Sequence, residues 1–108
     1  MDMPEEIIAG SDNIYADLGF KDAGELLLKA QLASVIKYLL DDKGLTQVQA
    51  AKMLGLPQPK LSRLLNGHFE NISEAKMLDC ITSLGRDIHI TIGPESSVHG
   101  RIDVLQTV

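Results

Sequence analysis

The side chains best suited to chemistry in this sequence lie between residues 44 and 69. Three cations, Lys52, Lys60 and Arg63, occur there among glutamines, serine and asparagine, and the window contains no Asp or Glu. Its charge is +3, whereas the whole chain has a net charge of -5 at pH 7. A cationic surface without carboxylates is compatible with phosphate groups, so we predict that this window can face a polyanion.

The other titratable side chains form no recognisable catalytic or metal-binding pattern. His68, His89 and His99 share no metal-ligand spacing. Cys80 has no histidine near it in the sequence, so we expect a small buried helix residue rather than a redox or catalytic group. The chain has no glycine-rich phosphate loop and no nucleophile elbow. We therefore predict no enzyme activity, no metal and no cofactor.

Length and composition favour one small, mainly helical domain. The 108 residues are 44% hydrophobic but only 4% aromatic, which indicates a core of Leu, Ile, Val and Ala. No stretch approaches the roughly 18 apolar residues of a membrane helix. The acidic start, MDMPEE, differs from a signal peptide, and the single cysteine cannot form an internal disulfide. These features predict a cytoplasmic protein without a membrane partner.

Two short helices should position the cationic window. Helical patterns occupy residues 46–54 and 57–66, and Gly55 between them suits a left-handed turn. Two helices of this length joined by a glycine-containing turn form a helix-turn-helix. The apolar positions expected to be buried are Val48, Ala51 and Leu54 in the first helix and Leu61, Leu64 and Leu65 in the second.

Longer helical patterns flank this pair. Residues 22–43 predict a first long helix, with a break between residues 29 and 34 as an alternative. Asn71 or Ser73 should cap a later helix, and residues 13–20 should form one packed helical turn. Helices are expected to stop at Gly44, Gly55, Gly67 and Gly85. The expected core positions are Leu26, Leu27, Ala30, Ala33, Ile36, Leu39 and Leu40 in the first helix and Ala75, Met77, Leu78, Ile81 and Leu84 in the last.

The sequence divides into three parts: a loose acidic arm (1–12), a helical domain (13–85) and a C-terminal β element (86–108). Isoleucines alternate with polar residues over 87–92, which predicts a strand, and residues 101–108 alternate more weakly. We predict that the first strand forms a dimer contact through Ile88, Ile90 and Ile92. A hairpin within one chain is the alternative.

The stretch GLTQVQAAKMLGLPQPKLSRLLNG resembles the helix-turn-helix of the Xre/Cro family of phage-repressor-like DNA-binding proteins. The resemblance rests on Gly44-Leu45-Thr46-Gln47, Ala51, Gly55, Leu61, Leu64 and Asn66-Gly67. It implies a mainly α, lambda repressor-like fold of four to five helices with a C-terminal strand or hairpin. It also implies a homodimeric repressor that binds an inverted-repeat operator in double-stranded DNA.

Residues 13–92 are also similar to HigA-type antitoxins, which are encoded beside RelE/HigB-like ribonuclease toxins. This similarity implies that the protein is the antitoxin of a toxin–antitoxin pair and regulates its own operon. The segment from Asp2 to Glu25 carries seven carboxylates and one lysine. Such an acidic segment could mask the cationic surface with which such a toxin binds RNA.

The resemblance places the start of helix 58–66 in the major groove, where Gln pairs with adenine and Arg with guanine. It implies base contacts by Gln58, Pro59, Lys60 and Arg63. It implies phosphate contacts by Gln47, Ser62, Asn66 and His68. Two residues depart from the family pattern, because Pro57 replaces the usual cap and Pro59 can offer only apolar contact. A helix-turn-helix that binds only proteins is the alternative interpretation.

Overall fold

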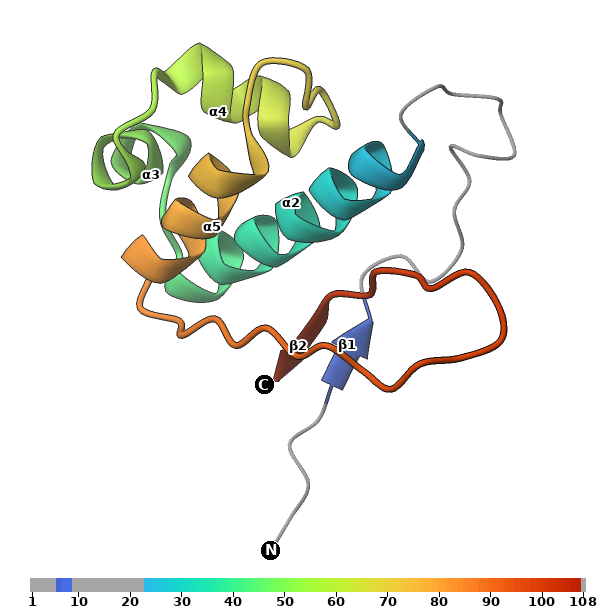
Figure 1. The fold of residues 1–108 in the computed structure, drawn as a ribbon. Coiled ribbons are helices and arrows are strands. Elements are labelled where there is room, and N and C mark those ends of the chain that lie inside the picture. The colour runs from blue at the N-terminus through green and yellow to red at the C-terminus, as the bar shows by residue number, and fades with distance from the viewer. Residues whose placement is uncertain (1–5, 9–22, 108) are drawn as a thin grey trace, which may run out of the picture.

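The computed structural model describes residues 6–8 and 23–107. Over these residues the elements are β1 (Glu6–Ile8), α2 (Ala23–Lys43), α3 (Gln47–Leu54), α4 (Gln58–Leu65), α5 (Glu74–Ser83) and β2 (Leu105–Thr107). The helices α2 and α5 pack on each other, and α3 and α4 cover one side of this pair (Figure 1). The predicted mainly helical fold is confirmed. The turn predicted for residues 13–20 lies outside the described residues.

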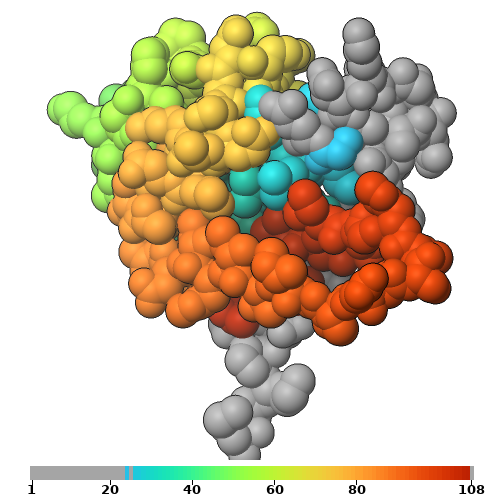
Figure 2. Space-filling view, viewed as in Figure 1, coloured from blue at the N-terminus to red at the C-terminus, as the bar shows by residue number. Residues whose placement is uncertain are grey.

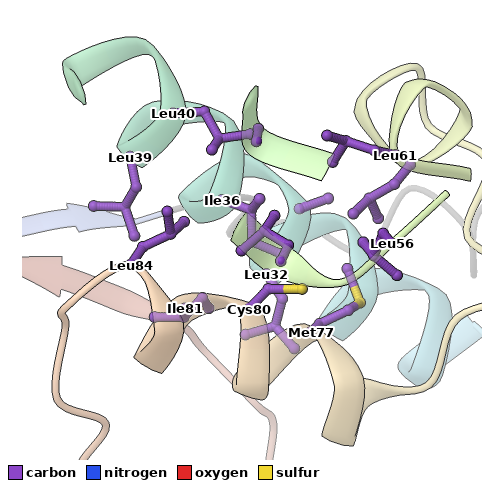
Figure 3. Packing of buried hydrophobic residues seen from close by; sticks show 14 of the residues in the cluster. Leu32, Ile36, Leu39, Leu40, Leu56, Leu61, Met77, Cys80, Ile81 and Leu84 are labelled. Atoms are coloured by element: carbon purple, nitrogen blue, oxygen red, sulfur yellow. The ribbon is translucent and has the colours of Figure 1, made fainter. Parts of the chain in front are cut away.

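The core forms where the four helices meet (Figure 3). Ile36 from α2, Leu61 from α4 and Met77 from α5 are all inaccessible to solvent. Burying one such side chain contributes about 1.5–3 kcal/mol to stability, so these contacts set the relative positions of the helices. Cys80 is also buried here, as expected. Burial raises the pKa of its thiol, which keeps the sulfur protonated and unreactive.

All four helices end in the same way. A glycine with φ between +65° and +90° follows each helix, at the four positions where the sequence predicts a stop. The next amide N–H then reaches back to a carbonyl five residues earlier, which is the Schellman arrangement. The four bonds are Leu45 to Leu40, Leu56 to Ala51, His68 to Arg63, and Arg86 to Ile81.

Two apolar residues expected in the core are instead exposed. Val48 is 60% exposed, and Ala75 also lies at the surface. Each motif helix is only eight residues long and contacts the core along a narrow face, which in α3 consists of Ala50, Ala51 and Leu54. Val48 lies about a third of a turn away from that face. Ala75 lies roughly opposite the buried face of α5, which consists of Met77, Cys80 and Ile81, so both predictions are wrong.

The alternative of a break between residues 29 and 34 is also wrong, because α2 is continuous through this region. The segment is covered on several sides by the rest of the domain. Gln31, Leu32 and Ala33 are all buried there. Lys29 is only 7% exposed, and its amine donates to the carbonyl of Phe69 over 3.2 Å. Packing on several sides explains why a mixed polar and apolar stretch stays helical.

The two strands form an antiparallel pair in which Glu6 lies opposite Thr107 and Ile8 lies opposite Leu105. This pair lies beside α2, away from α4 (Figure 1). The guanidinium of Arg86 donates to the carbonyl oxygen and to the hydroxyl oxygen of Thr107. Arg86 therefore ties β2 to the end of α5.

Residues 87–92 form no strand within the described chain, so the predicted strand is wrong here, whereas the dimer contact through Ile88, Ile90 and Ile92 stays a prediction. Ile88 is half-buried against the core, but Ile90 and Ile92 are 78% and 89% exposed. Alternation predicts a strand only where a second strand supplies hydrogen bonds, and β2 takes residues 6–8 as its partner. The alternative hairpin between residues 87–92 and 101–108 is therefore also absent. Because residues 6–8 form β1 in this pair, the prediction of a loose arm is wrong for these three residues.

We expect Gly55→Val to destabilise the protein by about 1–2 kcal/mol, because a residue with a Cβ is strained at φ +67°. Around the added Cβ only Lys76 Nζ comes close, at 3.9 Å, so the cost comes from the backbone rather than from a clash. Urea unfolding monitored by circular dichroism measures the change. Gly93→Val is the control, because Gly93 has open space and no positive φ. Equal unfolding midpoints for the two variants would contradict the prediction.

Candidate nucleic-acid interface

The helix α4 has one face in the core and one face in solvent. Leu61 and Leu64 are 0% and 1% exposed, and they fix the helix on the domain. Gln58, Pro59 and Arg63 are exposed. Three of the four side chains predicted to contact bases thus lie on the outer surface of one helix. Such a helix can enter a groove without disturbing the core.

The start of α4 depends on proline rather than on a side-chain cap. Pro57 is the N-cap residue with φ -59° and makes no side-chain capping bond, as the sequence predicts. Its carbonyl accepts the amides of Lys60 and Leu61 at 3.0 and 3.1 Å. Pro59, in the same turn, has no amide N–H to offer. Reading of DNA at this end therefore falls mainly to side chains.

Lys60 and Ser62 lie on the flanks of α4, since both are half-buried. Lys60 lines a shallow hollow between α4 and the following loop, together with Pro57, His68 and Ile72. The backbone carbonyl of Ser62 accepts the side-chain amide of Asn66 over 2.8 Å. Lys60 and Ser62 therefore border the outer face of α4 rather than standing at its centre. The base contact predicted for Lys60 stays a prediction.

The predicted phosphate contacts separate into two groups. Gln47 and Asn66 line a common hollow beside α2, whereas His68 lines the hollow on the other side of α4. The hollow lined by Gln47 and Asn66 is also lined by Lys37 and Asp41 from α2. Lys37 was not predicted as a site residue, because the spacing of apolar residues in α2 indicates only the side that packs on the core. The exposed face of α2 was the signal that could have found it.

The start of α3 is held by a reciprocal pair of side-chain bonds. Thr46 Oγ1 accepts the amide of Gln49 at 3.2 Å, and Gln49 Oε1 accepts the amide of Thr46 at 3.0 Å. This capping box confirms Thr46 as the N-cap. Gln47 is the first helical residue, is exposed, and has no acidic side chain in its turn. A helix start of this kind attracts anions.

Lys76 holds the turn between the two motif helices. Its amine donates to the carbonyl of Leu54 over 3.0 Å and lies 3.3 Å from the carboxylate of Asp79. Leu54 is the last residue of α3, so a cation from α5 satisfies the end of that helix. Sequence spacing alone could not pair residues 54 and 76, because they meet only when α5 packs on α3.

Glu70 is a second residue that the sequence analysis missed. It is the first carboxylate after the cationic window, and its Oε2 lies 3.8 Å from Nη2 of Arg63. The window itself therefore contains no acid, but one acid borders it both in sequence and in space. The described residues contain no group of His, Cys, Asp or Glu that could hold a metal. Within the same residues no helix is long and apolar enough to cross a membrane.

Comparison with known proteins identifies the arrangement. A family model described as a helix-turn-helix domain matches residues 14–93. A solved structure named as an XRE family transcriptional regulator is 35% identical, and the match covers 77% of this chain and 96% of that chain with a TM-score of 0.71. This chain belongs to the XRE-type helix-turn-helix family. A search of curated proteins finds no match.

Membership of the XRE-type family confirms the phage-repressor-like resemblance at the level of family and fold. In an XRE-type domain, α3 and α4 are the two helices of the motif, with Gly55 in its turn. The finer similarity to HigA-type antitoxins stays a prediction, as do the individual base and phosphate contacts. Most of the predicted base contacts would be made from the outer face of α4, where Gln58, Pro59 and Arg63 are exposed.

Proposed function

We propose that this XRE-type protein represses transcription by binding an inverted-repeat operator as a homodimer. Its family membership makes it a DNA-binding transcriptional regulator rather than an enzyme. The observation that carries the proposal is the outer face of α4, where Gln58, Pro59 and Arg63 are exposed above the buried Leu61 and Leu64. Gln58 and Arg63 are the base readers of the proposal, since both side chains can bind a base through two hydrogen bonds.

The phosphate contacts of the proposal surround this face. Gln47 and Asn66 would bind the backbone on one side of α4, and Lys60 and His68 on the other. Ser62 would contact the backbone from the flank. Cationic contacts of this kind release counterions, so affinity should fall with salt concentration. A protein-interaction module without DNA binding lacks a reason for keeping acids out of residues 44–69.

Arg63→Ala should weaken operator binding by about 1–3 kcal/mol and relax the preference at one base position. The measurement is a gel shift over a salt series with the DNA immediately upstream of the gene. Arg101→Ala is the matched control, because Arg101 is exposed but lies outside the motif and pairs with Asp103. Unchanged affinity and preference in Arg63→Ala would show that α4 is placed wrongly in the groove. No shift with the wild-type protein would favour the interaction module.

The dimer contact of the proposal is the exposed apolar segment that follows α5. Ile90, Ile92 and Val98 are each more than 70% exposed, which is a large apolar surface for a small domain. The segment covers one edge of the molecule below α5, and α4 lies at the opposite end of this view (Figure 2). A contact here would leave the reading face open. In the proposed dimer the two copies of α4 would lie roughly 34 Å apart, one turn of DNA.

Ile90→Glu should convert a dimer into a monomer, because a carboxylate at the centre of an apolar contact loses its hydration. Sedimentation velocity over a series of protein concentrations measures the oligomeric state. Met53→Glu is the control, since Met53 is a 51% exposed apolar residue on α3, outside the proposed contact. A wild-type monomer, or an Ile90→Glu protein that stays dimeric, would rule out this contact.

The most specific part of the proposal is that the protein acts as an antitoxin. It is supported by the similarity to HigA-type proteins and by the acidic residues between Asp2 and Glu25. A RelE/HigB-like toxin is the corresponding partner. Residues 6–8 form β1, so truncating the N-terminal segment would also remove the partner of β2. Neutralising charges outside β1 is the cleaner experiment.

Combined replacement of three N-terminal acids should weaken toxin binding, because attraction between opposite charges is lost. The variant is Asp2→Asn, Glu5→Gln and Asp12→Asn. Its matched control neutralises three exposed acids elsewhere, Asp41→Asn, Asp42→Asn and Glu95→Gln. The measurement is calorimetric titration with the purified product of the neighbouring gene. Equal binding of both variants, or a neighbouring gene that encodes no ribonuclease, would remove this part of the proposal.

A further inference from the structure

Arg63 on the outer face of α4 forms an ion pair with Glu70, and the proposed function gives no role to this pair. Arg63 Nη2 and Glu70 Oε2 are 3.8 Å apart, which is an ion-pair distance but longer than a direct hydrogen bond. The two side chains are 58% and 62% exposed. An exposed pair of this kind adds little to stability, so its placement calls for another explanation.

The backbone around Glu70 is held firmly beside α4. Gly67 turns the chain with φ +89°, and the amide of His68 bonds back to the carbonyl of Arg63 at 2.9 Å. Phe69 and Ile72, on either side of Glu70, are only 6% and 5% exposed. The carboxylate therefore reaches Arg63 from an anchored loop. The fold therefore fixes the backbone from which the Glu70 side chain extends towards Arg63.

A guanidinium can contact a base and a carboxylate at the same time. It has five N–H donors, and a guanine edge uses two of them. A carboxylate at ion-pair distance beside the remaining donors favours some orientations of the side chain before DNA arrives, which lowers the ordering cost of the base contact. The same carboxylate repels phosphates, so a phosphate that approaches Arg63 from this side also approaches the like charge of Glu70.

We propose that Glu70 is a positioning residue for DNA specificity, which directs Arg63 to a base edge and disfavours its contact with phosphates. The inference rests on the proposed function and deepens it. Specificity is a difference of affinities, and a group that weakens the wrong contacts raises it even if it also weakens total binding. Glu70 would thus reduce affinity for all DNA but increase the preference for the operator.

The test uses Glu70→Gln, which removes the charge and keeps the shape. Selection from a randomised double-stranded DNA library with the wild-type protein first defines the preferred site and the base pair that depends on Arg63. Binding is then measured to that site and to its three substitutions at this base pair. Glu95→Gln is the matched control, since it makes the same chemical change at an exposed loop position. All variants are checked for folding by circular dichroism.

Glu70→Gln should bind non-operator DNA more tightly and lose discrimination at the Arg63-dependent base pair by roughly 3- to 10-fold. In an Arg63→Ala background, the same substitution should leave discrimination unchanged, because Glu70 acts through Arg63. Equal tightening for every DNA sequence, or no change at all, would overturn the inference and leave the proposed function intact. Failure of the wild-type protein to select any sequence would overturn the proposed function itself.

Discussion

The position of α4 depends on burying Leu61 and Leu64 against the other helices, and the DNA-facing surface depends on that burial. The helix has only eight residues and cannot be stable alone, so tertiary contacts supply most of its stability. Because the inner face is fully used, the outer face can carry side chains that contribute nothing to folding. A short helix anchored along one face thus separates the residues under selection for stability from those available for recognition.

Two lysines outside the motif hold the chain on either side of α4. Lys76 from α5 bonds the end of α3 just before the turn, and Lys29 from α2 bonds the carbonyl of Phe69 in the loop that follows. Lys76 satisfies a carbonyl that the end of α3 leaves without a helical partner, and Lys29 anchors the loop between α4 and α5. In this acidic protein some of the positive charge therefore stabilises the frame of the interface rather than contacting a ligand.

Much of the fold could be predicted from the sequence because its signals are local. The four glycines at left-handed positions, the Thr46–Gln49 box and the spacing of Leu61 and Leu64 each act within one or two turns. The pairing of residues 6–8 with 105–107 could not be predicted, because three-residue strands have no pattern of their own. The alternating isoleucines were misleading for a related reason, since alternation does not say whether a partner strand is present.

The candidate site was predictable in part for the same reason. The exposed positions of Gln58 and Arg63 follow from helical periodicity once α4 is recognised. Lys37 comes from α2 and meets the motif only through tertiary packing, whereas Glu70 follows the motif directly and is brought back to Arg63 by the turn at Gly67. Counting charged residues along the chain compares only residues that are neighbours in sequence. The interface, however, is made of neighbours in space.

The β1–β2 pair has a consequence for the order in which the protein can form. Residues 6–8 are synthesised before the helices, but their partners at 105–107 are synthesised after them, about a hundred residues later. The helices meet through much shorter separations along the chain, so they can assemble while this pair is still open. During translation the helical part is therefore complete before the chain can join its two distant segments. The β1–β2 pair therefore forms only after the helices have been synthesised.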